Sequence, residues 1–317
     1  MKQLDYKKVF NVLVEETKNY LLDNNLKAMI LGISGGIDST VTAAICYEVS
    51  KQTGIPLIGR SLPIKNKEDE FDTSKLVGEA FCDNFRIVYL NKPYLSILYS
   101  TLVWESKISR TEGHCVEEDL LPLTTPIANG NIQARLRMIY LYNLASVYNG
   151  LVMSTDNQTE YQLGFWTIHG DVGDFDPLQD LWKTEVYSLA EWLSDYYKDV
   201  LKSLDSVEEK LEYCKMYEAI NESIDLTPTD GLGISNSDLE QIGAKSYEEV
   251  DTILQDFLAY NEMFSATAKK LNIDSYLKCN TLFNIESDVI EKVLNRHLAS
   301  EFKRKNLPIY IERKTYE

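Results

Sequence analysis

Apolar residues change their spacing along the chain in a way that separates helices from strands. Near the N-terminus, Val9, Leu13 and Tyr20 recur close to helical spacing, which predicts an amphipathic helix over residues 3–23. The next apolar stretches are short and continuous, a pattern more typical of strands. We therefore expect a leading helix followed by the first strand of a sheet.

Strands and helices then alternate through the first half of the chain. Strands are predicted over residues 27–33, 55–62, 85–90 and 150–154, with helices over 38–51, 67–82, 94–104 and 129–148 between them. This alternation implies an α/β fold with a parallel sheet packed against helices. Ligands of such sheets bind at the carboxyl ends of the strands.

The remainder of the chain is predicted to be mainly helical. Helices are expected over residues 183–197, 199–222, 246–271 and 285–304, with loops over 164–177 and 226–233. The sequence holds no internal repeat and no convincing linker, so one domain spanning residues 1–317 is the simplest organisation. The acidic cluster at 117–119 indicates an exposed charged surface rather than a metal site.

A glycine turn joins the first predicted strand to the helix that follows it. Its sequence is Ser34-Gly35-Gly36-Ile37-Asp38-Ser39. The start of a helix attracts anions, and adjacent glycines let the backbone wrap closely around a phosphate. The turn lacks the lysine of the common P-loop, and Asp38 would repel a polyphosphate unless a divalent cation lay between them. A tight turn capped by Ser or Asp is the alternative, but the full motif favours a phosphate site that contains Mg²⁺.

Two further positions suggest nucleotide chemistry, although each has a simpler interpretation. Thr155 follows the fourth predicted strand and could cap a helix or contact a nucleotide, while Glu160 could be an exposed acid or a second oxygen ligand for Mg²⁺. Lys183 begins a predicted helix, where the helix dipole disfavours a cation. A nearby phosphate would offset that mismatch.

Arg135 and Arg137 lie about 200° apart around the predicted helix that contains them, so their side chains cannot point the same way. One of them can enter a site while the other forms a pair on the surface.

Composition limits the possible partners. The formal net charge of −17 argues against a general nucleic-acid binder, which would need a basic face. The five cysteines are widely spaced and form no Cys-x-x-Cys pair, which indicates reduced thiols rather than a zinc site or a disulfide framework. Since no apolar run is long enough for a membrane helix and the N-terminus is polar, we expect no membrane partner and a cytoplasmic location.

The glycine turn resembles the pyrophosphate-binding loop of the N-type ATP pyrophosphatases. Later motifs resemble one family within this superfamily, the ammonia-dependent NAD synthetases, and this resemblance covers almost the whole chain. These motifs are Asn-x-x-Ala-Arg-x-Arg-Met at 131–138, Thr-Asp-x-x-x-Glu at 155–160, a Gly-Phe…Gly-Asp loop at 164–171, Lys-Thr at 183–184, Pro-Thr at 228–229, Ser-Tyr-Glu-Glu-Val-Asp at 246–251 and a Lys-Arg stretch near the C-terminus. Several such motifs in the right order are far more specific than one. Relative to this family the chain carries extra residues at about 92–126.

The resemblance implies a three-layer, adenine-nucleotide-hydrolase-like fold with a parallel sheet and a helical C-terminal part, in a homodimer whose substrate lies at the subunit interface. It implies that the ATP phosphates are held by Gly32, Ile33, Ser34, Gly35, Gly36, Ile37, Asp38 and Ser39, with further ATP contacts from Thr155, Lys183 and Thr229. It implies Asp38 and Glu160 as Mg²⁺ ligands, and Asp38, Glu160 and Lys183 as the catalytic set. The substrate nicotinic acid adenine dinucleotide (deamido-NAD⁺) would be bound by Arg135, Asp174 and Lys303.

The reaction implied by the resemblance is an ATP-dependent amidation. ATP activates the carboxylate of deamido-NAD⁺ as an acyl-adenylate and releases pyrophosphate, after which ammonia displaces AMP to give NAD⁺. The glycine turn, Lys183 and Mg²⁺ would stabilise the charge that builds on the pyrophosphate. No protein nucleophile is needed, and the ammonia would come from solution or from a partner.

Three departures from the family pattern fall in the dinucleotide half of the site. Ile168 stands where the family has a substrate-binding lysine, one residue is missing before Pro177, and Phe302-Lys303 replaces a His-Lys pair. His169 could supply the missing cation or be an ordinary loop histidine. Ile168 therefore favours one alternative, a pyrophosphatase of the same fold that amidates or adenylates another carboxylate.

A catalytically silent nucleotide-binding regulator is the second alternative. Such a protein would have no need to keep Asp38, Glu160 and Lys183.

Overall fold

The computed structural model describes residues 4–64, 72–105, 124–227, 237–265, 273–279, 282 and 284–305. Its centre is a sheet of four parallel strands in the order β3-β2-β1-β4. The strands are β1 (Met29–Gly32), β2 (Leu57–Ser61), β3 (Asn84–Ile87) and β4 (Leu151–Met153). In this register Met29 of β1 lies opposite Leu57 of β2 and Leu151 of β4.

Alternate residues of the central strands pack into two different hydrophobic cores. Met29 and Leu31 face the larger core, whereas Ala28 and Ile30 face the core formed with the helix α6 (Pro126–Tyr148). All four residues are fully buried, as expected where both faces of a parallel sheet are covered. The sheet is therefore the middle of three layers.

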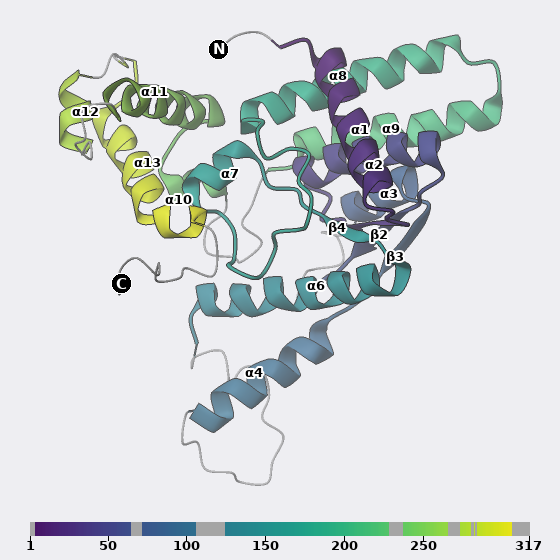
Figure 1. Ribbon diagram of the computed structural model, residues 1–317, viewed down its shortest axis with the longest axis horizontal. Coiled ribbons are helices and arrows are strands. Elements are labelled where there is room, and N and C mark those ends of the chain that lie inside the picture. Colours follow the sequence, from purple (N-terminus) through teal and green to yellow (C-terminus); the bar gives the residue numbers. More distant parts are fainter. Residues whose placement is uncertain are drawn as a thin grey trace.

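Helices form the two outer layers (Figure 1). One face of the sheet is covered by α1 (Tyr6–Asp23), α2 (Ile37–Thr53), α3 (Asp72–Phe81), α8 (Lys183–Ser203) and α9 (Val207–Asp225). The other face is covered by α6, and α4 (Asn91–Glu105) packs against α6 through Tyr94, Leu98 and Leu136.

A further hydrophobic core lies beside the sheet and is built mainly from helices. It comprises α7 (Gln158–Leu163), α10 (Asp238–Ile242), α11 (Tyr247–Ser265), α12 (Ile273–Cys279) and α13 (Ser287–Ala299). Phe257, Tyr276 and Leu294 are buried in it. The short 3₁₀ helix η3 (Glu301–Arg304) follows α13 and buries none of its residues. Figure 1 shows α10 to α13 grouped at one side of the molecule.

The α/β class, the parallel sheet and the helical C-terminal part that the sequence predicts are confirmed. Two predicted helix boundaries are wrong. Helix α8 continues to Ser203, and the next helix starts only at Val207, where the side chain of Ser206 caps it. The predicted helix over 285–304 is divided at Ser300 into α13 and η3, and the short helices α10 and α12 were not predicted.

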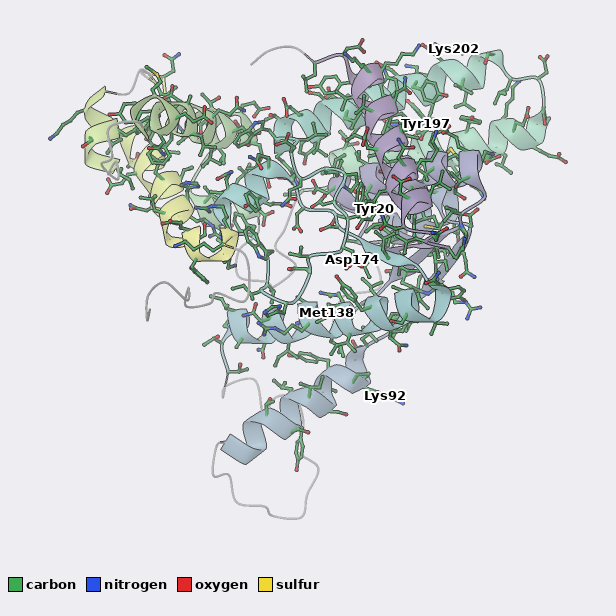
Figure 2. The ribbon with its side chains drawn as sticks, viewed as in Figure 1. Tyr20, Lys92, Met138, Asp174, Tyr197 and Lys202 are labelled. Carbon is green, nitrogen blue, oxygen red and sulfur yellow. The ribbon has the colours of Figure 1, made fainter. Side chains whose placement is uncertain are left out.

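Parts of several predicted elements lie outside the described residues. These are residues 67–71 of the helix predicted over 67–82, the acidic cluster at 117–119, residues 228–233 of the predicted loop and residues 266–271 of the helix predicted over 246–271. None of the described helices is long and apolar enough to cross a membrane. Figure 2 shows the side chains of the described residues on the same fold.

Candidate active site

The glycine turn and the Thr-Asp motif lie next to each other at the carboxyl edge of the sheet. Strand β1 pairs with β2 on one side and with β4 on the other, so the strand order reverses direction between β1 and β4. In doubly wound sheets the loops that follow two such strands separate and leave a crevice where ligands bind. The turn after β1 and residues 154–157 after β4 therefore form the candidate ligand-binding site.

The glycine turn has a backbone that only glycine fits. Gly35 adopts φ +86°, and a Cβ atom there would lie 2.7 Å from the backbone nitrogen of Ser74 in α3. Gly36 is the N-cap of α2 and supplies no side-chain cap, which leaves the start of this helix open to an anion. Ser34 and Ser39 brace the turn, since their hydroxyl oxygens are 3.0 Å apart and Ser39 also donates to the carbonyl of Gly36.

Asp38, Glu160 and Lys183 meet at this edge although they are far apart in sequence. The ammonium of Lys183 forms an ion pair with Asp38 and a second one, of 3.1 Å, with Glu160. Lys183 is only 2% exposed, while the two carboxylates are 15% and 22% exposed. The catalytic set that the resemblance implies thus forms one cluster of charges in the structure.

Asn157 is a member of this cluster that the sequence reasoning missed. Its side-chain nitrogen donates to Asp38 over 2.8 Å, and its side-chain oxygen accepts from the backbone N–H of Glu160 over 3.0 Å. The carboxylate of Glu160 accepts in return from the backbone of Asn157, which makes a capping box at the start of α7. The spacing Asn-x-x-Glu after a strand was the available signal.

Burial and pairing act in opposite directions on the charges of the cluster. Burial alone would lower the pKa of Lys183, but Asp38 and Glu160 raise it well above its usual value, so the side chain is an ammonium. Burial raises the pKa of Glu160 to about 7, although Lys183 opposes that shift. The ring of Tyr247 in α11 lies 5.6 Å from the ammonium of Lys183, so the C-terminal helices form one wall of the site.

Two more carboxylates lie near the cluster with raised pKa values. Burial raises the pKa of Asp176 to about 7, and nearby Asp38 adds to the shift. Burial also raises the pKa of Asp156, with Glu160 and Asp176 adding to the effect. This edge of the sheet is therefore strongly acidic around one buried cation.

The donor set is suitable for magnesium bound together with phosphate. Among the described residues no group of three or more His, Cys, Asp or Glu side chains is arranged to hold a metal ion. Mg²⁺ in nucleotide sites commonly takes only one or two carboxylates and completes its shell with phosphate and water oxygens. Asp38 and Glu160, which already share one cation, fit that requirement.

The remaining predicted ATP contacts are placed only in part. Gly32 and Ile33 lie at the end of β1, and Thr155 is half-buried just after β4. Thr229 lies outside the described residues.

Two of the predicted substrate-binding residues hold the loop 164–168. Arg135 donates from Nε and Nη2 to the carbonyl of Ile168, over 3.3 and 3.1 Å. Lys303 donates to the carbonyls of Gly164, over 2.6 Å, and of Trp166. Helix α6 and the C-terminal η3 are thus connected through the loop that contains Ile168.

Asp174, the third of these residues, is bonded elsewhere. Its carboxylate accepts from the hydroxyl of Tyr142 over 2.9 Å and from the backbone N–H of Val152 over 3.0 Å. Figure 2 shows it beside α6. Arg137 points away from Arg135, as the helix spacing predicts, and donates to the carbonyl of Leu62 over 3.0 Å.

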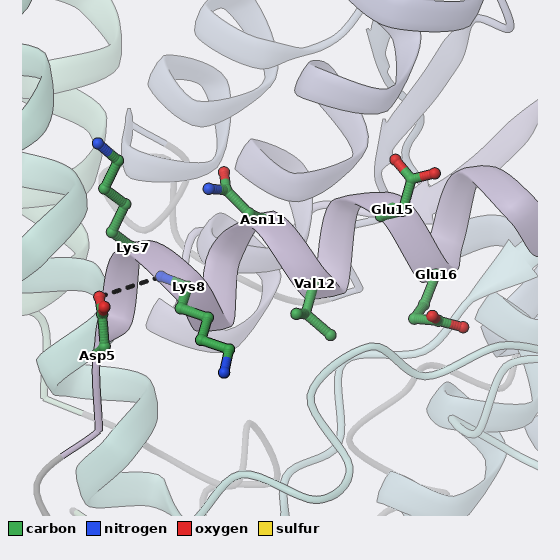
Figure 3. A pocket seen from close by; sticks show the side chains of 7 residues that line it. All are labelled: Asp5, Lys7, Lys8, Asn11, Val12, Glu15 and Glu16. Atoms are coloured by element: carbon green, nitrogen blue, oxygen red, sulfur yellow. Dashed lines mark hydrogen bonds between the residues drawn. The ribbon is translucent and has the colours of Figure 1, made fainter.

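A separate hollow lies on the surface of α1 (Figure 3). It is open and lined by side chains from residues 5–16 alone, with charges of both signs. None of the residues predicted for ATP or substrate belongs to it, so the candidate site stays at the edge of the sheet.

The sheet order and the glycine turn at its switch point are those of a doubly wound α/β fold that binds ligands at this edge, and solved structures share the fold. The chain superposes on the NMN synthetase from Francisella tularensis with a TM-score of 0.67 and 23% identity, covering 98% of this chain and 100% of that one. For the NH3-dependent NAD synthetase from Campylobacter jejuni the TM-score is 0.62 and the identity 22%, with the same coverage. At these identities the likeness shows the fold alone.

Sequence comparison is more specific. The family model described as NAD synthase matches residues 9–307. The NH(3)-dependent NAD(+) synthetase of Thermococcus sibiricus is 30% identical over 98% of both chains, and that of Finegoldia magna is 30% identical over 87% of this chain and 92% of its own. The chain belongs to the NAD synthase family, and the predicted N-type ATP pyrophosphatase fold and NAD synthase class are confirmed.

Proposed function

We propose that this protein makes NAD⁺ by amidating deamido-NAD⁺ with ammonia in an ATP-dependent reaction. The observation that carries the proposal is the buried Lys183 held between Asp38 and Glu160, beside the glycine turn, in a member of the NAD synthase family. This arrangement places a buried cation and two carboxylates beside a turn of the kind that binds anions, at the carboxyl edge of the sheet.

The glycine turn and Lys183 are assigned to the phosphates of ATP. The backbone at the start of α2 would bind the β- and γ-phosphates, with the hydroxyls of Ser34 and Ser39 as further donors. Asp38 and Glu160 would hold Mg²⁺, which screens the repulsion between carboxylate and phosphate and stabilises the leaving pyrophosphate. Lys183 is close enough to both carboxylates to donate to the same phosphate group.

The proposed chemistry has two displacements. A carboxylate oxygen of deamido-NAD⁺ attacks the α-phosphorus of ATP, the bond to the β-phosphate oxygen breaks, and pyrophosphate leaves. Ammonia then attacks the acyl carbon and loses a proton as the bond to AMP breaks, which leaves the amide. The protein contributes position and charge stabilisation in both steps and forms no covalent intermediate.

The assignment of Arg135, Asp174 and Lys303 to deamido-NAD⁺ stays a prediction, as do the homodimer, ammonia as nitrogen donor, the cytoplasmic location and the single domain with an insertion at about 92–126. Sedimentation of the purified protein tests the dimer directly.

The central test is a turnover assay with the purified protein. ATP, Mg²⁺, ammonium and deamido-NAD⁺ should yield NAD⁺, AMP and pyrophosphate in equal amounts. Asp38→Ala should reduce pyrophosphate release by about 100-fold or more, because it removes a group that acts directly on the leaving phosphates. Its circular dichroism spectrum should stay native, and full retained activity would refute the magnesium assignment. ATP binding without any turnover would instead support the silent regulator.

A second candidate substrate is favoured by Ile168. An apolar side chain at this position offers no charge to the phosphates of a dinucleotide, and Arg135 donates to the backbone carbonyl of Ile168. The similar structure from Francisella tularensis is that of an NMN synthetase, so we take nicotinic acid mononucleotide as the alternative carboxylate. Comparing kcat/KM for the two substrates separates the candidates, since a ratio above ten for the mononucleotide would overturn deamido-NAD⁺ as the preferred substrate.

A further inference from the structure

A fully buried carboxylate, Asp251, connects the C-terminal helices to the candidate site. It belongs to α11 and is 0% exposed, next to the hydrophobic core of the C-terminal helices. A buried carboxylate is costly unless hydrogen bonds or charges stabilise it. Its partners therefore indicate what it does for the protein.

The carboxylate of Asp251 accepts three hydrogen bonds from two threonines. One oxygen accepts from the hydroxyl of Thr159 over 2.5 Å, and the other accepts from the backbone N–H and the hydroxyl of Thr184 over 3.0 and 2.8 Å. The hydroxyl of Thr159 accepts in turn from the backbone N–H of Lys183 over 2.9 Å. One side chain thus joins the first turns of α7 and α8.

These two threonines are the chain neighbours of the site residues. Thr159 immediately precedes Glu160, and Thr184 immediately follows Lys183. A negative charge at the start of α8 also compensates the helix dipole, which disfavours a lysine at that position. The bond network therefore fixes the distance between the Glu160 carboxylate and the Lys183 ammonium through their own backbones.

We infer that Asp251 is a positioning residue that sets the spacing of Glu160 and Lys183 for Mg²⁺ and the phosphates of ATP. The inference rests on the proposed function, because it requires these two residues to act on Mg²⁺ and ATP. Asp251 touches no substrate itself and acts through Thr159 and Thr184. Outer partners of this kind typically change metal affinity or activity by about 10- to 100-fold when they are removed.

Asp251→Asn is the first test, because it keeps the shape and removes the charge. The amide has one oxygen for three donors, so its NH₂ group must face the Thr159 hydroxyl or the Thr184 donors. We expect the Mg²⁺ concentration for half-maximal activity to rise about tenfold and kcat to fall, with the KM for deamido-NAD⁺ unchanged. Asp256→Asn is the matched control, since Asp256 lies on the same helix and accepts from Tyr276, so its Mg²⁺ dependence should be native.

A second pair of variants covers the case in which Asp251→Asn fails to fold. Thr159→Ser keeps the hydroxyl between Asp251 and Lys183 and should behave like the native protein, whereas Thr159→Val removes it and should reproduce the Mg²⁺ defect. Binding of α,β-methylene ATP with Mg²⁺, followed by calorimetry, gives a reading that needs no turnover. Because this reading does not depend on deamido-NAD⁺, it tests the positioning role of Asp251 even if the proposed substrate is wrong. Lower thermal stability with native Mg²⁺ dependence and native affinity for the analogue would overturn the positioning role.

Discussion

Lys183 is the residue on which the site depends. A lysine at the first position of a helix is disfavoured by the helix dipole, and a buried ammonium is tolerated only when it is paired. From the sequence, a bound phosphate is the expected compensation, but in the structure Asp38 and Glu160 already provide it. The same ammonium can therefore serve two sets of anions, first the carboxylates of the protein and then the phosphates of ATP.

Lys183→Met should lower stability and make the protein more responsive to magnesium. The substitution keeps the volume but leaves Asp38 and Glu160 as two close carboxylates without a shared cation. Removing one partner of a buried pair costs about 3–5 kcal/mol, and since both acids are partly exposed we expect about 2 kcal/mol. Thermal unfolding with and without millimolar Mg²⁺ measures the effect, and Mg²⁺ should raise the Tm of the variant more than that of the native protein.

Lys202→Met is the control for that experiment. Lys202 pairs with Asp199 at 2.7 Å on an exposed part of α8, and its loss should change neither the Tm nor the Mg²⁺ response by much. An equal Mg²⁺ response in the native protein and Lys183→Met would contradict Asp38 and Glu160 as the metal ligands.

Asp176→Asn should stabilise the protein more at pH 8 than at pH 5. Burial raises the pKa of Asp176 from its usual value near 4 to about 7. A group whose folded-state pKa is raised adds stability at low pH, and that stability is lost as the pH rises through about 7. The neutral amide avoids this loss and can still accept from the backbone N–H of Leu178. Urea unfolding at pH 5 and pH 8 measures the change in the free energy of unfolding, with the exposed Asp180→Asn as the reference. A stability gain confined to pH 5 would refute the raised pKa of Asp176.

The residues of the site were predictable to different degrees. Asp38 stands out because it would repel a polyphosphate unless a cation lay between them, and Lys183 because the helix dipole disfavours a cation at the start of a helix. Glu160 has a simpler interpretation and is assigned through the family resemblance. Asn157 carried a local signal in its spacing from Glu160, the Asn-x-x-Glu pattern of a capping box. Asp251 ends the motif at 246–251, but that motif does not indicate its role, which arises only where α11 packs against the starts of α7 and α8. Contacts that depend on tertiary packing leave no periodic trace in a sequence.

At the scale of elements, the glycine turn between β1 and α2 combines two requirements. Its backbone needs a positive φ at Gly35, and its neighbour α3 leaves no room for a side chain there. The strands were predictable because short apolar runs mark buried parallel strands. The end of α8 was not, because the residues between Ser203 and Val207 contain neither glycine nor proline, and the break is fixed by the Ser206 cap and the packing of α8 on α9.

Gly35→Ala tests the turn before α2, and Gly54→Ala, at the other end of α2, is its control. The new methyl group would lie 2.7 Å from the nitrogen of Ser74, so we expect a loss of about 2–3 kcal/mol and at least tenfold weaker binding of Mg²⁺–ATP. Gly54 at the other end of α2 also has a positive φ, 72°, but open space around it. Gly54→Ala should cost about 1 kcal/mol and leave the ATP affinity native, as measured by calorimetry. Equal ATP affinities in both variants would show that the turn does not bind phosphate.

At the scale of the whole molecule, the site is formed jointly by the sheet layer and the C-terminal helices. The connection from β1 and the start of α2 contribute the glycine turn and Asp38, while α11 supplies Tyr247 and Asp251 behind Lys183. Lys303 of η3 ties the same helical part to the loop 164–168. A chain shortened before α11 would therefore lose one wall of the site, even though the sheet layer has its own core.

The net charge of the molecule predicts an unusual response to salt. The chain carries 49 acidic and 32 basic side chains, for a net charge of −17, and both proposed substrates are anions. Long-range repulsion should therefore slow their encounter at low ionic strength, where the Debye length is about 30 Å at 0.01 M salt, compared with about 8 Å at 0.15 M. Raising KCl across this range at constant free Mg²⁺ should lower the KM for deamido-NAD⁺ by about twofold. A KM that rises with KCl would instead mean that the local cations Lys183, Arg135 and Lys303 outweigh the charge of the whole protein during binding.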